Sequence, residues 1–222
     1  MERRTQHVLN RILYLFIAAS LLFAGESGGV DGQQALSLLK EGNKRYTESS
    51  LKSKDFSSDR QQQAKGQQPY AIILTCSDSR VAPEILFDES LGRLFVIRVA
   101  GNVIDPVVVG SIEYAAEHLH AKLLFVLGHS SCGAVKAAVQ GGELPPNIKM
   151  IVDRIEPAVA KARKTEKEAD ALLGKAVTEN VNEQLASALR SSPILKELIE
   201  KKEFTVAGGV YNIKSGEVSF FR

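Results

Sequence analysis

Residues 71–75 read AIILT, and three more short apolar runs follow: LFVIRVA at 94–100, LLFVLG at 123–128 and FTVAGGVYNI at 204–213. Nearly continuous runs of apolar, β-branched and aromatic residues are typical of strands buried on both faces of a sheet. Segments with helical character lie between them, at 83–91, 107–120, 132–140 and several from 148 to 202. This alternation predicts an α/β fold with a mostly parallel central sheet and helices on both faces. The turn KSGE before the final VSFF predicts an antiparallel edge strand.

The chain before the first strand has a different character. Residues 33–46 carry apolar side chains at helical spacing, whereas residues 47–68 are polar with few apolar anchors. We therefore expect residues 28–69 to form an N-terminal helical arm and connector, and residues 70–222 to form the α/β domain. Late in the chain, the charge run KARKTEKEAD at 161–170 is typical of a solvated helix face.

The first 27 residues have the pattern of a signal peptide. Residues 1–11 are basic, and residues 12–25 form a 14-residue apolar run. That run is shorter than the ~20 residues that a membrane span needs. We expect residues 1–27 to be a leader, with its cleavage site undetermined, and the mature protein to be periplasmic or secreted. A buried N-terminal helix and an uncleaved anchor are the alternatives.

The charge balance excludes one class of partner. The 222 residues are 44% hydrophobic and 24% charged, which is ordinary for a globular protein. The net charge of +2 comes from the first 25 residues, which hold three arginines and one glutamate, and the remaining basic and acidic residues cancel. Nucleic-acid binding requires a basic stripe. We therefore expect no nucleic-acid partner, and no membrane contact once the leader is removed.

The two cysteines follow different predicted strands. Cys76 comes directly after the first strand, in CSDSR, while His129 and Cys132 come after the third, in GHSSCG. Because the carboxyl ends of parallel strands meet at one edge, these three side chains should lie together. Two thiols and an imidazole are ligand types that zinc prefers, and a fourth position remains for water or for the carboxylate of Asp78. A Cys76–Cys132 disulfide and a Cys132–His129 nucleophile pair are the alternatives.

The segments CSDSRVAPEILFDESLGRLFVIRVAGNV at 76–103 and SIEYAAEHLHAKLLFVLGHSSCGAVKAAV at 111–139 strongly resemble the β-class carbonic anhydrases. The resemblance covers residues 34–222 and is most specific in the paired C-x-D-x-R and H-x-x-C motifs. It implies reversible hydration of carbon dioxide to bicarbonate and a proton by zinc-bound hydroxide. It also implies a homodimer or a larger assembly, in which the N-terminal arm embraces a second subunit.

Residue by residue, the resemblance makes Cys76, His129 and Cys132 the ligands of Zn²⁺. It makes Asp78 and Arg80 a catalytic dyad, in which Arg80 holds Asp78 away from the metal and Asp78 becomes a fourth ligand when released. The residues implied for the carbon dioxide pocket, partly supplied by the neighbouring subunit, are Gln67, Phe95 and Tyr114. Gly133 would present a backbone N–H to the bound anion.

Three further features bear on this interpretation. Ile73 and Thr75 stand where the bicarbonate-gated branch of the family has tryptophan and glycine, so we expect no bicarbonate site of that kind. Arg93 replaces an acidic residue and is expected to alter a surface ion pair only. His118 and His120 are candidate proton shuttles, although surface histidines without a chemical role are the simpler interpretation.

Two other functions remain open from the sequence. The same zinc site would also suit hydrolysis of carbonyl sulfide or carbon disulfide, which the family fold is known to host. A non-catalytic zinc or redox-sensing protein is the alternative from another class. The Asp78–Arg80 pair favours an enzyme, because a structural metal site has no need of an orienting carboxylate and its clamp.

Overall fold

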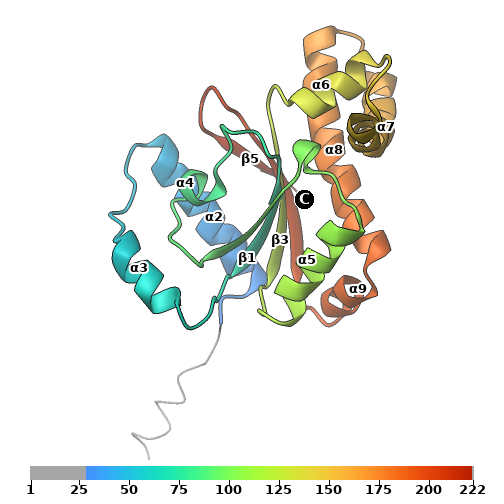
Figure 1. The fold of residues 1–222 in the computed structure, drawn as a ribbon. Coiled ribbons are helices and arrows are strands. Elements are labelled where there is room, and N and C mark those ends of the chain that lie inside the picture. The colour runs from blue at the N-terminus through green and yellow to red at the C-terminus, as the bar shows by residue number, and fades with distance from the viewer. Residues whose placement is uncertain (1–28, 222) are drawn as a thin grey trace, which may run out of the picture.

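The computed structural model describes residues 29–221, so the predicted leader lies outside the described residues. Five strands form one sheet in the order β2-β1-β3-β4-β5 (Figure 1). The strands are β1 (Ala71–Thr75), β2 (Leu94–Arg98), β3 (Leu123–His129), β4 (Thr205–Tyr211) and β5 (Val218–Phe221). The first four are parallel and β5 is antiparallel to β4. The predicted sheet, with its antiparallel edge, is confirmed.

Helices cover both faces of the sheet, as predicted (Figure 1). On one side lie α2 (Gly32–Thr47) and the short α4 (Pro83–Leu86), with α3 (Phe56–Gln63) further out. On the other side lie α5 (Pro106–Glu117), α8 (Ala169–Ser191) and α9 (Pro193–Glu200). Helices α6 (Gly133–Gln140) and α7 (Pro146–Thr165) pack against each other and against α8. Among the described residues, no helix has the length and apolar character to cross a membrane.

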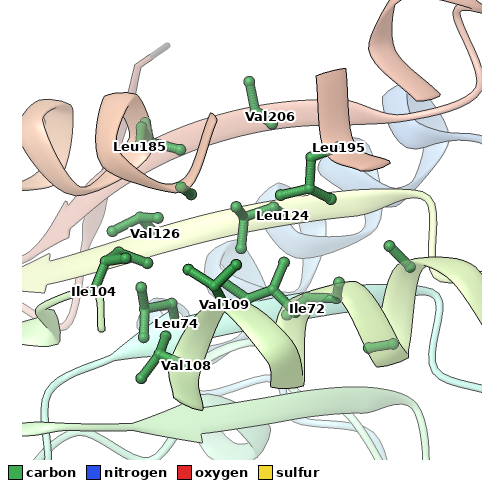
Figure 2. Close-up of a cluster of buried hydrophobic side chains, with 14 of the residues drawn as sticks. Ile72, Leu74, Ile104, Val108, Val109, Leu124, Val126, Leu185, Leu195 and Val206 are labelled. Carbon is green, nitrogen blue, oxygen red and sulfur yellow. The ribbon is translucent and has the colours of Figure 1, made fainter. Parts of the chain in front are cut away.

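The central strands are buried along their whole length. Every residue of β1 and β3 is buried, which explains why both read as continuous apolar runs. On one face, Ile72 and Leu124 pack against side chains of α5, α8 and α9 (Figure 2). On the other face, Ile73 and Phe125 pack in a cluster that includes Leu39 of α2. Each such side chain contributes roughly 1.5–3 kcal/mol of burial free energy.

Helix α2 belongs to the core of its own chain. Its Ala35 and Leu39 are fully buried against the sheet, and Asp31 caps its first turn. At Gly42 the helix passes so close to the backbone of Phe87 that a Cβ would lie 1.8 Å from the carbonyl oxygen, so only glycine fits there. Within residues 28–69, the exposed character expected of an arm is therefore found beyond α2. Helix α3 has no buried residue.

Three sequence-based boundaries were wrong. The helix expected at 83–91 ends at Leu86, because the chain turns through a positive φ at Asp88. The strand expected at 94–100 ends at Arg98 and is followed by η1 (Ala100–Asn102), a single 3₁₀ turn. The charge run at 161–170 is not one helix face, since it spans the break between α7 and α8.

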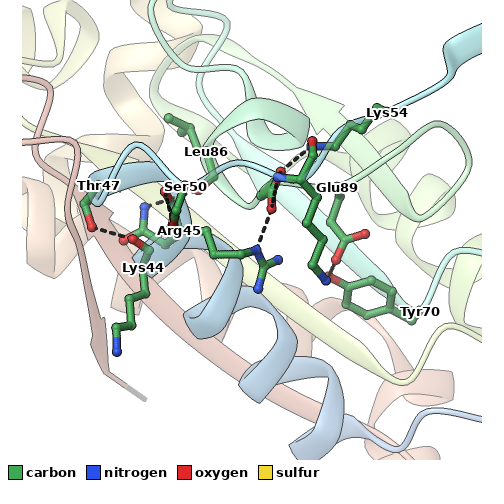
Figure 3. A network of polar contacts seen from close by, with 11 residues as sticks. Lys44, Arg45, Thr47, Ser50, Lys54, Tyr70, Leu86 and Glu89 are labelled. Carbon is green, nitrogen blue, oxygen red and sulfur yellow. Dashed lines mark hydrogen bonds and ion pairs between the residues drawn. The ribbon is translucent and has the colours of Figure 1, made fainter.

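A buried carboxylate joins the N-terminal segment to the domain. The side chain of Asp88 is fully buried and accepts bonds from Arg45 Nε of α2 at 2.5 Å, from Lys54 Nζ and from the backbone N–H of Lys52 (Figure 3). Burial by itself raises the pKa of Asp88, but the bonds from Arg45 and Lys54 outweigh it and lower the pKa to about 2. The ionised carboxylate therefore stabilises the fold.

Replacing Asp88 with asparagine should lower the free energy of unfolding by about 3 kcal/mol near neutral pH, because Arg45 and Lys54 lose their buried counter-charge. The folded-state pKa lies below the ordinary 3.8, so this stabilisation is complete above that value and is lost as the pH falls toward about 2. Urea unfolding should show that the difference in unfolding free energy between Asp88→Asn and the parent protein is smaller at acidic than at neutral pH.

The matched control is Asp153→Asn, which removes an exposed ion pair with Lys149 at 2.6 Å. Exposed pairs contribute less than about 1 kcal/mol. Equal effects of the two substitutions would contradict the role assigned to Asp88.

Candidate metal centre

Cys76, His129 and Cys132 form a buried cluster. Their candidate ligand atoms all lie within 4.8 Å of one another, and all three residues are buried. Cys76 directly follows β1, His129 ends β3, and Cys132 is the N-cap of α6. No disulfide joins the two cysteines, so that alternative is not supported. The three side chains expected at the carboxyl edge of the sheet are thus brought together.

The turn between His129 and Cys132 folds the chain back onto the cluster. Ser131 adopts a positive φ of 57°. Ser130 is fixed on both sides: its N–H donates to the carbonyl of Tyr211 at 2.8 Å, and its hydroxyl accepts from the N–H of Ile213 at 3.0 Å. The end of β4 therefore holds the turn that returns Cys132 to the side of His129.

The imidazole of His129 has one nitrogen satisfied and one free. Nδ1 lies 3.0 Å from the carbonyl oxygen of Ser130, an acceptor, so the proton belongs on Nδ1. Nε2 then carries a lone pair, and it is one of only two buried side-chain N or O atoms without a partner among the described residues. A buried lone pair beside two thiols is the donor set that a zinc ion requires.

The two sulfurs have opposite tendencies to ionise. Cys76 Sγ accepts the N–H of Gly101 at 3.3 Å, and the pKa of Cys76 is lowered by Cys132 first and also by His129 and that amide. The neighbouring Cys76 and burial raise the pKa of Cys132. A negative charge on Cys76 disfavours a second one on Cys132, and a divalent ion would remove that penalty.

Asp78 and Arg80 lie beside the cluster as a bidentate pair. Arg80 Nε donates to Asp78 Oδ1 at 2.9 Å and Nη2 donates to Oδ2 at 2.8 Å, with the backbone N–H of Arg80 on Oδ1 at 3.0 Å. The bonds from Arg80 hold the pKa of Asp78 well below its usual range. Asp78 Oδ2 lies 3.9 Å from His129 Nε2. The ionised carboxylate is thus turned toward Arg80 while remaining next to the ligand atoms.

The residues expected to line the substrate pocket are not all at this cluster. Phe95 pairs with Ile72, four residues before Cys76, which is about 13 Å along the strand. The rings of Phe95 and Tyr114 are 6.3 Å apart, and Tyr114 is 48% exposed. Gln67 is exposed ahead of β1, at the opposite end of the sheet from Cys76. Within one chain, these three side chains do not reach the cluster.

Gly133 lies next to the cluster, whereas His118 and His120 lie far from it. Gly133 is the first residue of α6, next to Cys132, and a Cβ built there would meet nothing within 4 Å. His118 is the C-cap of α5 and His120 precedes β3, whereas His129 is the last residue of β3. The length of β3, about 20 Å, therefore separates both histidines from the cluster of their own chain. A proton-shuttle role within one chain is not supported.

Sequence reasoning missed two groups around the cluster. Arg98, at the end of β2, donates through Nη2 to the carbonyl of Asp78 at 2.7 Å and through Nε to that of Cys76 at 3.4 Å. A charged residue closing an apolar strand was the available signal. The amide of Gly101 offered no signal, because every non-proline residue carries the same donor. Arg93, expected only to alter a surface ion pair, lies 3.9 Å from the half-buried Glu89.

Comparison with known proteins identifies the family of this chain. The carbonic anhydrase family model matches residues 71–218. Carbonic anhydrase 2 of Mycobacterium tuberculosis is 40% identical over 185 residues, covering 80% of this chain and 87% of that protein. The carbonic anhydrase of Mycolicibacterium smegmatis is 38% identical and covers 81% and 88%. The structure of the β-carbonic anhydrase CcaA superposes with a TM-score of 0.67 at 30% identity, covering 84% and 87%. The curated relatives are carbonate dehydratases, which are lyases, and the chain belongs to the β-class carbonic anhydrase family.

Proposed function

We propose that this protein is a zinc-dependent carbonic anhydrase that interconverts carbon dioxide and bicarbonate. The observation that carries the proposal is the buried Cys76–His129–Cys132 cluster beside a carboxylate that Arg80 holds aside. These three residues would hold the ion, which leaves a fourth position open. The chemistry that zinc supplies when bound there is the activation of water near neutral pH. The names of the relatives support carbon dioxide as the substrate.

The residues around the proposed ion orient the reacting water and accept a hydrogen bond from it. Asp78, ionised at neutral pH, accepts a hydrogen bond from the reacting water and so orients it toward the substrate. Arg80 engages both carboxylate oxygens, which keeps Asp78 ionised and prevents it from taking the fourth position. The N–H of Gly133, at the start of α6 and next to Cys132, would face an anionic product.

Arg80→Ala should retain zinc but lower kcat/KM for carbon dioxide hydration about 100-fold. The released carboxylate of Asp78 is already 3.9 Å from His129 Nε2 and can turn into the cluster. Arg80→Lys should lose nearly as much, because lysine lacks the planar fork that binds both oxygens. Stopped-flow assays with metal analysis on the same samples provide the measurement.

The control is Arg190→Ala, which removes an exposed arginine bonded to Glu183 at 2.7 Å on α8. It should leave turnover unchanged. An Arg80→Ala protein as active as the parent would refute the role of the dyad.

Zinc removal should abolish activity and expose two reactive thiols per chain. The purified protein should contain one zinc per chain, because the cluster has one set of three ligands. Cys132→Ser should lose the metal, whereas Asp78→Asn should keep it, since that carboxylate is bonded to Arg80 and is not among the three ligands. Metal analysis measures the zinc content of the parent and the variants, and thiol titration after chelation counts the exposed thiols. A metal-free protein without free thiols would contradict the proposal.

We further propose that the substrate pocket is completed by a second subunit. On α5, Val107 is 77% exposed and Tyr114 is 48% exposed, although both are large and apolar. Next to this helix, β2 is an edge strand of the sheet and carries the half-buried Phe95, whose ring lies near that of Tyr114. Exposed apolar groups of this kind mark an interface. Self-association there would carry Phe95 and Tyr114 to a partner's metal centre.

Val107→Glu should therefore dissociate the assembly and abolish most turnover while leaving the zinc content unchanged. Burying a charge in an apolar interface is costly, but the three metal ligands lie within one chain. Sedimentation velocity, metal analysis and the hydration assay test this together. Met150→Glu, at an exposed apolar position on α7, is the control. A Val107→Glu protein that is monomeric and fully active would contradict a shared pocket.

We also propose that the protein is exported, on the basis of the leader pattern at residues 1–27. In an oxidising compartment, the thiols of Cys76 and Cys132 would be at risk of forming a disulfide. Loading of zinc before oxidation would protect them, because each coordinated sulfur is held by the metal. Cell fractionation with N-terminal sequencing of the mature protein would test export and identify the cleavage site.

A further inference from the structure

The backbone turn that contacts Cys76 is tightly constrained. Gly101 and Asn102 both have positive φ, at 69° and 47°, and residues 101–104 are all buried. A Cβ on Gly101 would lie 2.7 Å from Ile155 Cδ1, so glycine is required both for the conformation and for the space. This turn directs the amide N–H of Gly101 to Cys76 Sγ at 3.3 Å.

Two buried carboxamides of α8 hold both ends of this turn. Asn180 Nδ2 donates to the carbonyl of Gly101 at 2.8 Å, and Gln184 Oε1 accepts the N–H of Ile104 at 2.8 Å. Gln184 Nε2 also donates to Asn180 Oδ1 at 3.0 Å and to the carbonyl of Arg154 at 3.2 Å. The two residues are only 1% and 2% exposed, one helical turn apart, on a helix face that otherwise buries apolar side chains.

We propose that Asn180 and Gln184 are positioning residues for the metal centre, acting through the Gly101 amide on the sulfur of Cys76. This inference rests on the proposed metal site and extends it to α8. A backbone N–H donated to a thiolate draws electron density from the sulfur and fixes its direction. The carboxamides anchor the carbonyl of Gly101 and the N–H of Ile104, so a rigid helix holds the turn that orients the sulfur.

A purely structural role would give a different result, and Asn43 provides the matched control. Asn43 of α2 is also buried, donating through Nδ2 to the carbonyls of Leu86 and Gly216 at 3.2 and 3.0 Å. Its Oδ1 accepts the N–H of Val218 at 2.9 Å. It therefore bridges backbone segments as Asn180 does, but within the α2 side of the core and not at the metal cluster.

The test uses the full apoprotein loaded with Co²⁺, whose sulfur-to-cobalt absorption reports on the thiolates. Asn180→Leu and Gln184→Met should each release the turn, so that the Gly101 N–H no longer points at the Cys76 sulfur. The band should then move to lower energy, because a sulfur without its N–H donor gives up an electron more readily. Each should also weaken Co²⁺ binding roughly 10- to 100-fold. Asn43→Leu should lower Tm but leave the band and the affinity unchanged.

Both α8 variants binding Co²⁺ with the parent's band and affinity would overturn the inference and leave the metal centre standing. Parent protein that binds no Co²⁺ would instead overturn the metal centre, and the inference with it. A measurement on the unaltered chain covers variants that fail to fold. In ¹⁵N-labelled protein loaded with ¹¹³Cd²⁺, the Gly101 amide proton should show scalar coupling to cadmium through the sulfur, and its absence would also overturn the inference.

Discussion

Parallel pairing of β1 with β3 controls the distances on which the metal centre depends. The ladder runs from Ala71 opposite Leu123 to Thr75 opposite Leu127, and the candidate ligands Cys76 and His129 follow within two residues of its end. A slip of one residue would turn every side chain of one strand to the other face of the sheet. The apolar side chains buried on both faces prevent that slip. The core that stabilises the fold therefore also sets the spacing of the sulfur and the imidazole.

The surroundings of the cluster favour a divalent cation over the protonated side chains. Cys76 and Cys132 belong to a cluster of buried apolar residues that includes Val135 and Ile155, where an uncompensated charge is costly. Cys76 and burial raise the pKa of Cys132, and the amides in the first turn of α6 oppose this only in part, because they supply only partial positive charge. Two thiolates and a neutral imidazole around a divalent ion give a formally neutral unit. Burial of the cluster would thus favour the proposed metal-bound form.

Much of the fold and the three candidate ligands could be predicted because both leave a local pattern of residue types in the sequence. Strands buried on both faces leave continuous apolar runs, and the ligands follow those runs directly. The support around the ligands could not be predicted, since Gly101 acts through a backbone amide that all but proline share. The early end of α4 depends on Asp88, whose ion pairs come from residues more than 30 positions away. Helix propensity depends on neighbouring residues only, so it does not reveal such distant partners.

The positions of Phe95 and Tyr114 are the basis for the proposal that catalysis requires assembly. The three candidate metal ligands lie within one chain, so a monomer would have what it needs to hold the ion. The apolar wall that would hold carbon dioxide is absent from that cluster, because Phe95 pairs with Ile72 well back along the sheet. Phe95 lies on the edge strand β2 and Tyr114 lies on the exposed helix α5, so both side chains are near the surface of the chain. If the proposed shared pocket is correct, metal binding can be complete before subunits associate, whereas turnover would require their association, and the two should respond differently to dilution.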